Sequence, residues 1–94
     1  MRIKSWEELT MKRRVHYMTI SFRGDTEVTY IQRDEAIEVT FEQPKYGGFN
    51  TLVTDIDGNI IERDGFTNAA VEFLISFLED NSPVIIEECR GEYV

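Results

Sequence analysis

The chain has 94 residues, enough for one domain with a modest core but not for a core together with a deep enzyme cleft. Hydrophobic residues make up 41% and aromatic residues 12% of the sequence, an ordinary share for a globular protein that argues against general disorder. The net charge of −8 argues against direct binding of nucleic acid, because an acidic body repels phosphates and attracts basic surfaces.

The charge is divided unevenly along the chain. The first 23 residues carry six basic and two acidic side chains, a net charge of +4. The remaining residues carry four basic and sixteen acidic side chains, a net charge of −12. The basic cluster Lys12-Arg13-Arg14 could touch a phosphate, but the acidic body beside it would repel the rest of a duplex.

The N-terminal residues predict a short helix over about 6–13, because Ser5 and Glu8 fit a capping box. No apolar stretch of a secretory signal is present there, and the longest nearly apolar run, residues 69–78, is too short to span a bilayer. Cys89 is the one cysteine, so no disulfide can form within the chain. These features favour a cytoplasmic protein that does not enter a membrane.

A change to a period of two predicts three half-buried strands after the helix. The apolar residues that alternate with polar ones are Met18, Ile20 and Phe22, then Val28 and Tyr30, then Ile37, Val39 and Phe41. A two-residue loop at 34–35 makes the apolar faces of the last two strands agree, with Tyr30 opposite Val39. A three-residue loop at 23–25 does so for the first two, with Ile20 opposite Val28 and with Gly24 at positive φ.

The second half of the sequence predicts a loop, a hairpin, a long helix and a last strand. Residues 43–48 read as a loop, and residues 49–56 and 60–63 form a hairpin around Asp57-Gly58-Asn59 whose register stays open. A helix capped by Thr67 or Asn68 then reaches about Glu79, and its broad apolar stripe must lie flat on the sheet. Residues 81–83 would end this helix, and residues 83–89 would form a final strand.

The predicted fold is therefore α+β in a single domain spanning residues 1–94. An antiparallel sheet of about five or six strands carries the long helix of the C-terminal half on its core face, and the short N-terminal helix completes the domain.

The segment around Asp55 and Asp57 is similar to two functional motifs. Residues 52–59 resemble the first motif of haloacid-dehalogenase-type phosphatases, but the later lysine and acidic motifs of that family do not follow. Asp55, Asp57 and Asn59 match the first ligand positions of an EF-hand loop, but Ile60 replaces its glycine and Phe66 its bidentate glutamate. We interpret the segment as an Asp-Gly hairpin turn and keep weak cation binding as an alternative.

His16 and Cys89 are the only residues of their types. We expect His16 at the open end of the core face near Gln32, and Cys89 as a buried or half-buried residue of the last strand. Neither a Cys–His catalytic pair nor a structural zinc site is expected from them. The sequence therefore predicts no catalytic residue, no cofactor and no metal site, and a protein that is not an enzyme.

The outward sheet face is the best candidate for a protein-binding surface. The predicted pairing places three rows across it, namely Tyr17, Ile31 and Glu38, then Thr19, Thr29 and Thr40, then Ser21, Glu27 and Glu42. Tyr46, on the glycine-rich loop, is a candidate exposed anchor. The predicted protein-binding residues are Tyr17, Glu27, Ile31, Glu38, Glu42 and Tyr46. The alternative is an ordinary solvated sheet face.

These observations predict a small acidic, non-enzymatic protein that binds a basic protein partner. One concrete form is an inhibitor, encoded by a phage or mobile element, that blocks a nucleic-acid-binding surface by charge mimicry. The alternative is a structural or regulatory homo-oligomeric subunit, such as a homodimer joined through a sheet face or edge. A small enzyme or a weak metal-binding protein comes third, and the acidic charge could also serve solubility alone.

Overall fold

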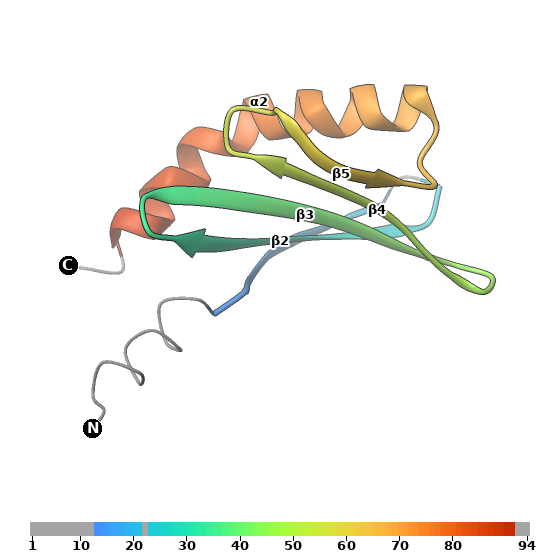
Figure 1. Cartoon of the computed structure of the whole chain (residues 1–94), viewed down its shortest axis with the longest axis horizontal. Helices are drawn as coiled ribbons and strands as arrows, with labels where there is room; N and C mark the ends of the chain where they lie inside the picture. The colour runs from blue at the N-terminus through green and yellow to red at the C-terminus, as the bar shows by residue number, and fades with distance from the viewer. Residues whose placement is uncertain (1–12, 22, 92–94) are drawn as a thin grey trace.

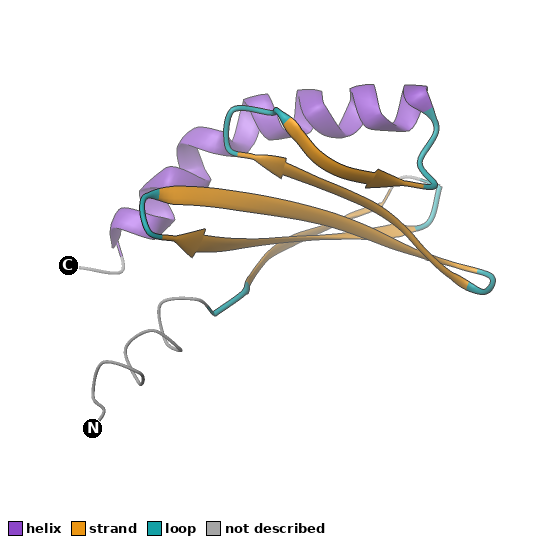
Figure 2. Ribbon diagram, viewed as in Figure 1, coloured by secondary structure: helices purple, strands orange, loops and turns teal. Residues whose placement is uncertain are grey.

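The computed structural model describes residues 13–21 and 23–91. They form five strands and one helix, namely β1 (Val15–Ser21), β2 (Asp25–Arg33), β3 (Ala36–Lys45), β4 (Gly48–Asp55), β5 (Ile60–Asp64) and α2 (Asn68–Gly91). The strands pair antiparallel in the order β1-β2-β3-β4-β5, and α2 lies across one face of this sheet (Figures 1 and 2). The α+β class is confirmed, with five strands. The predicted N-terminal helix falls, apart from Arg13, outside the described residues.

The hairpin of β2 and β3 has the predicted register. Tyr30 lies opposite Val39 and Val28 opposite Phe41, with a two-residue loop between the strands. Asp34, the first loop residue, has a φ of 56°, a left-handed conformation that aspartate tolerates better than most residues. The alternation of apolar residues and the loop length together allow one register here, so the sequence was sufficient to predict it.

The hairpin of β1 and β2 has a different register from the predicted one. The chain turns between Ser21 and Asp25, so Ile20 lies opposite Thr26 and not opposite Val28. A shift of two residues leaves the same face of a strand turned inward, and apolar alternation cannot distinguish the two registers. A β-bulge between His16 and Met18 changes the alternation once more. The predicted positive φ of Gly24 is confirmed at 116°.

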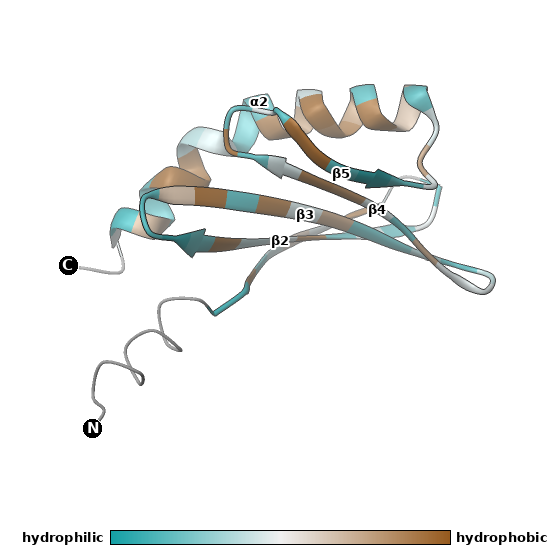
Figure 3. Ribbon diagram, in the orientation of Figure 1, coloured by the Kyte–Doolittle hydropathy of each residue, from teal (hydrophilic) through white to brown (hydrophobic). Residues whose placement is uncertain are grey.

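The core fills the space between α2 and one face of the sheet, hereafter the core face. Its buried residues are Val28, Tyr30, Ile37, Val39, Phe41, Leu52, Phe66, Val71, Leu74, Leu78, Ile85 and Cys89. Brown bands on β3 and on α2 mark this apolar layer in Figure 3. Leu74 and Leu78 are each 1% exposed, which agrees with the apolar stripe predicted to lie on the sheet, whereas Ile20 is only half-buried at the edge of the core.

Helix α2 does not end at residues 81–83, and the predicted final strand is wrong. The helix continues to Gly91 because Leu78, Ile85 and Cys89 repeat the helical spacing and are all buried against the sheet. Pro83 disfavours a helix interior and the β-branched run at 84–86 favours a strand, but packing overrides both propensities. Pro83 supplies no backbone N–H, and the C-terminal half of the helix turns away from the line of the first half in Figure 1.

The hairpin of β4 and β5 settles the register that the sequence left open. Val53 lies opposite Glu62 and Thr54 opposite Ile60, with an irregularity that leaves Ile61 between the pairs. Ile60 and Ile61 are 49% and 55% exposed, so neither enters the core and neither could fix the register.

The segment predicted as a loop at 43–48 is largely strand, since β3 runs through Pro44 to Lys45. Pairing of β3 with β2 ends at Glu42, so Pro44 lies where only β4 is beside it. A proline, which cannot donate a backbone hydrogen bond, is tolerated at such a one-sided position.

Candidate functional site

The sheet face turned away from α2, hereafter the outer face, carries three rows of side chains across the strands. Their members are Ile31, Glu38 and Asp55 in the first row, His16, Thr29, Thr40, Val53 and Glu62 in the second, and Thr19, Glu27, Glu42, Thr51 and Asp64 in the third. No described helix covers this face (Figure 1). The structure thus brings Glu27, Ile31, Glu38 and Glu42 together on one face, as predicted.

Tyr17 does not belong to the outer face, which corrects its predicted place beside Ile31. Its hydroxyl donates a hydrogen bond of 2.7 Å to Oδ1 of Asn81 on α2, and its ring packs near those of Tyr30 and Phe77. The β-bulge turns Tyr17 toward the helix. Burial, together with the nearby carboxylate of Glu88, raises the pKa of the Tyr17 hydroxyl.

Acidic residues face each other directly at two places on the outer face. Glu27 lies opposite Glu42, as predicted, and Glu38 lies opposite Asp55. Like charges on directly opposite residues destabilise a sheet, because their Cβ atoms are only about 5 Å apart. Within the described ranges, neither Glu38 nor Glu42 forms an ion pair, whereas Glu27 has His16 beside it.

His16 pairs with Glu27 across the first two strands. Its Nδ1 lies 3.0 Å from Oε2 of Glu27, and both side chains are about half exposed. The predicted position of His16 on the core face near Gln32 is therefore wrong, and the register of β1 is the reason. Cys89 lies in α2 rather than in a strand, and it is buried in the core as expected. His16 lies on the outer face and Cys89 lies in the core on the other side of the sheet, so the two residues do not form a Cys–His pair.

Asp55 is occupied in forming the turn between β4 and β5. Its Oδ1 accepts hydrogen bonds from the backbone N–H groups of Asp57 (3.0 Å) and Asn59 (2.9 Å), and its Oδ2 accepts one from Nδ2 of Asn59 (2.9 Å). The side-chain bond from Asn59 is the main cause of the lowered pKa of Asp55. This geometry agrees with the hairpin-turn interpretation. The described residues include no group of three or more His, Cys, Asp or Glu that could hold a metal ion.

Arg14 lies across the middle of the outer face, which the sequence did not predict. Its Nη1 donates hydrogen bonds of 3.1 Å to the hydroxyls of both Thr29 and Thr40. These threonines are only 7% and 8% exposed, so the centre of the face is not an ordinary solvated surface. The sequence did contain a clue to this contact, because basic residues are concentrated just before β1 and the rest of the chain is acidic.

Ile31 and Tyr46 differ sharply in their accessibility. Ile31 lies on the outer face as predicted, but it is only 5% exposed and offers little surface to a partner. Tyr46, in the turn between β3 and β4, is fully exposed, so its predicted exposure is confirmed.

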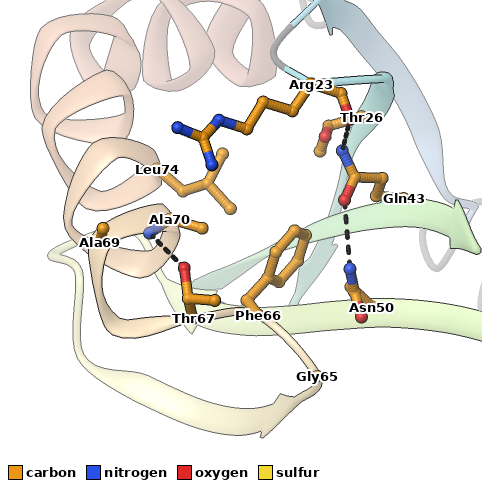
Figure 4. Close-up of a pocket in the computed structure, with 10 residues that line it drawn as sticks. All are labelled: Arg23, Thr26, Gln43, Asn50, Gly65, Phe66, Thr67, Ala69, Ala70 and Leu74. Atoms are coloured by element: carbon orange, nitrogen blue, oxygen red, sulfur yellow. Dashed lines mark hydrogen bonds between the residues drawn. The ribbon is translucent and has the colours of Figure 1, made fainter.

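Two pockets lie beside α2. Figure 4 shows one of about 170 Å³, lined by Arg23, Thr26, Gln43, Asn50, Gly65, Phe66, Thr67, Ala69, Ala70 and Leu74. Gln43 bridges it, donating to the carbonyl of Arg23 (3.2 Å) and accepting from Nδ2 of Asn50 (3.1 Å). These bonds connect the turn between β1 and β2 to the hairpin of β3 and β4, so Gln43 has a structural role. The other pocket, of about 500 Å³, lies between the C-terminal half of α2 and the turns at 34–35 and 56–59.

In the described part of the chain, no helix combines the length and apolar character that crossing a membrane requires. Comparisons with protein-family models, with curated proteins and with solved structures found no significant match to this chain.

Proposed function

We propose that this protein is a small, non-enzymatic acidic binding protein whose outer face engages a basic surface of a protein partner. The observation that carries the proposal is the gathering of Glu27, Glu38 and Glu42 on the outer face, where Glu27 lies directly opposite Glu42. Carboxylates on directly opposite residues repel each other, and a cationic partner would relieve that repulsion. Acidic side chains placed in this way suit the binding of a cation better than the stability of the free sheet.

The net charge of −8 extends this preference beyond direct contact. A strongly charged body steers an oppositely charged partner and raises its association rate. Surfaces that bind nucleic acid are basic because they neutralise closely spaced phosphates. Glu27 and Glu42 lie on neighbouring strands about 4.8 Å apart, so their negative charges are closely spaced, as those of phosphates are. We therefore infer that the partner is a nucleic-acid-binding protein and that this chain blocks its basic surface by charge mimicry, as an inhibitor.

Affinity capture with matched variants tests the proposal. The tagged protein is compared with the triple variant Glu27→Gln, Glu38→Gln and Glu42→Gln. Proteins recovered from the cells of origin are identified by mass spectrometry. We expect the wild type to recover a basic nucleic-acid-binding protein and the triple variant to lose it.

The matched control neutralises three exposed acids on the opposite side of the molecule, in α2. It carries the changes Glu72→Gln, Glu79→Gln and Asp80→Asn, so its net charge equals that of the first variant. The control should keep the partner. Equal loss of the partner in both variants would show that only net charge matters, and retention by the outer-face variant would contradict the proposal.

The edge strand β5 favours a second candidate function, a homo-oligomeric structural or regulatory subunit. All five residues of β5 are exposed, and Ile60 and Ile61 are about half exposed. An edge strand has unpaired backbone groups that can add a strand from another copy. The charged residues at 62–64 oppose such pairing, so we place this candidate second.

A further inference from the structure

The outer face already accommodates one guanidinium group, and this observation deepens the proposed function, on which the present inference rests. We propose that Thr29 and Thr40, together with the carboxylates around them, form a binding site for an arginine side chain of the partner. Arg14 occupies this site in the free protein and is displaced when the partner binds.

The first step of the argument is the contact of Arg14. One nitrogen of its guanidinium donates to both threonine hydroxyls at 3.1 Å, so two neighbouring strands converge on one donor. Thr29 and Thr40 lie directly opposite each other and are more than nine-tenths buried, whereas Arg14 itself is exposed. The site is therefore a fixed pair of hydroxyl acceptors beneath a cation that solvent can reach.

The second step is the arrangement of charge around the threonines. Residues two apart on a strand share a face and lie about 6.8 Å apart. Glu38 and Glu42 therefore lie on either side of Thr40, and Glu27 lies beside Thr29. An arginine at the site can bond the hydroxyls and a carboxylate together, because its planar group carries five N–H donors. A lysine ammonium is more compact and more strongly hydrated, so it fits the site less well.

The third step is that Arg14 is held weakly. Among the described residues it forms no ion pair, and its two hydrogen bonds are to neutral hydroxyls. Hydrogen bonds to neutral hydroxyls are weaker than the bidentate bonds that a guanidinium makes with a carboxylate. Arg14 also precedes the first residue of β1, so its side chain can leave the site without disturbing a strand. An incoming arginine that also pairs with Glu38 or Glu42 has the stronger set of contacts.

The test measures binding of two synthetic peptides, nonaarginine and nonalysine, by titration calorimetry. The variant Arg14→Ala empties the site, and Arg13→Ala is the matched control. Arg13→Ala removes the same charge as Arg14→Ala. Arg13 is exposed and has no hydrogen bond within the described residues. If Arg14 fills the site for about nine-tenths of the time, Arg14→Ala should bind nonaarginine about tenfold more tightly than Arg13→Ala does.

Arg14→Ala should also prefer nonaarginine to nonalysine, and the further changes Thr29→Val and Thr40→Val should abolish this preference. In a nuclear magnetic resonance titration of Arg14→Ala, the methyl signals of both threonines should shift when nonaarginine is added. Equal or weaker binding by Arg14→Ala than by Arg13→Ala would overturn the inference, and so would unshifted threonine signals. If no form of the protein binds either peptide, the proposed function itself fails.

Discussion

The hydroxyl of Tyr30, in the middle of β2, donates a hydrogen bond of 2.8 Å to Oε1 of Glu88, near the end of α2. The two residues are 58 positions apart in the chain. The bond lies beyond Pro83, so it fastens the part of the helix that follows the proline to the sheet. This hydrogen bond and the burial of Ile85 and Cys89 explain why the segment after Pro83 is helical.

Removing this hydroxyl should destabilise the domain. We expect Tyr30→Phe to lower the free energy of unfolding by about 1–2 kcal/mol, because the bond is made to a charged acceptor. Urea denaturation followed by circular dichroism measures it. Tyr46→Phe is the control, since Tyr46 is fully exposed, and it should change nothing. Equal stabilities of wild type and Tyr30→Phe would contradict a role for this bond.

Truncation of the central helix residue should have a larger effect. Leu74 is 1% exposed, so Leu74→Ala leaves a cavity and should lower the free energy of unfolding by about 2–5 kcal/mol. Val84→Ala, at a position of the same helix that is 47% exposed, should cost much less. A Leu74→Ala variant as stable in urea as the wild type would show that α2 does not pack on the sheet.

The turn at Asp55 should make part of the stability depend on pH. The pKa of Asp55 is lowered in the folded protein, so its contribution is present above the unfolded value of 3.8 and is lost as pH falls through the folded value. Asp55→Asn should therefore be less stable than the wild type near neutral pH, and the difference should shrink in acid. Thermal unfolding at a series of pH values tests this expectation.

The neighbouring aspartate serves as the control for that experiment. The carboxylate of Asp57 accepts no hydrogen bond within the described residues, so Asp57→Asn should change stability little at any pH. The double variant at 55 and 57 should keep binding its partner. A correctly folded double variant without activity would show that this segment has a functional role.

Salt should slow the association of the protein with its partner. Screening weakens long-range attraction, so the association rate should fall steeply from low to physiological salt while dissociation changes less. Reversing the charges of Glu27, Glu38 and Glu42 to lysine should slow association more than reversing Glu72, Glu79 and Asp80 in α2. Stopped-flow kinetics with the captured partner measures both. A rate that does not respond to salt would reject charge steering.

Light scattering at micromolar concentration separates the two candidate functions. A free binding protein should have the monomer mass of 11.0 kDa. A persistent dimer would favour the oligomeric subunit, and its expected seam is β5. In that case Ile60→Lys together with Ile61→Lys should restore the monomer, because charged edge residues oppose pairing between strands.

The sequence predicted those parts of the fold in which local pattern and packing agree. Tyr30 opposite Val39 followed from the alternation and a short loop. The register of β1 did not follow, because a two-residue shift keeps the same face inward. The second half of α2 was missed because Pro83 and the β-branched run after it point to a strand, while the deciding contact, between Ile85 and the sheet, is distant in sequence.

The candidate site was predictable to the same extent. The acidic residues of β2 and β3 share a face because of strand alternation alone. Tyr17 was misplaced because a β-bulge has no clear sequence signal. The contact of Arg14 with Thr40 depends on where the chain before β1 lies in space, and no periodicity reports that.

The order of the strands also has a consequence for how the chain folds. Each strand pairs with its neighbour in sequence, so every loop that must close is short and its entropic cost is small. Such topologies fold quickly, since the rate falls as contacts become more distant in sequence. The remaining step is the docking of α2, whose contact with β2 spans most of the chain. We therefore expect the successive hairpins to form rapidly and the docking of α2 on the core face to limit the overall folding rate.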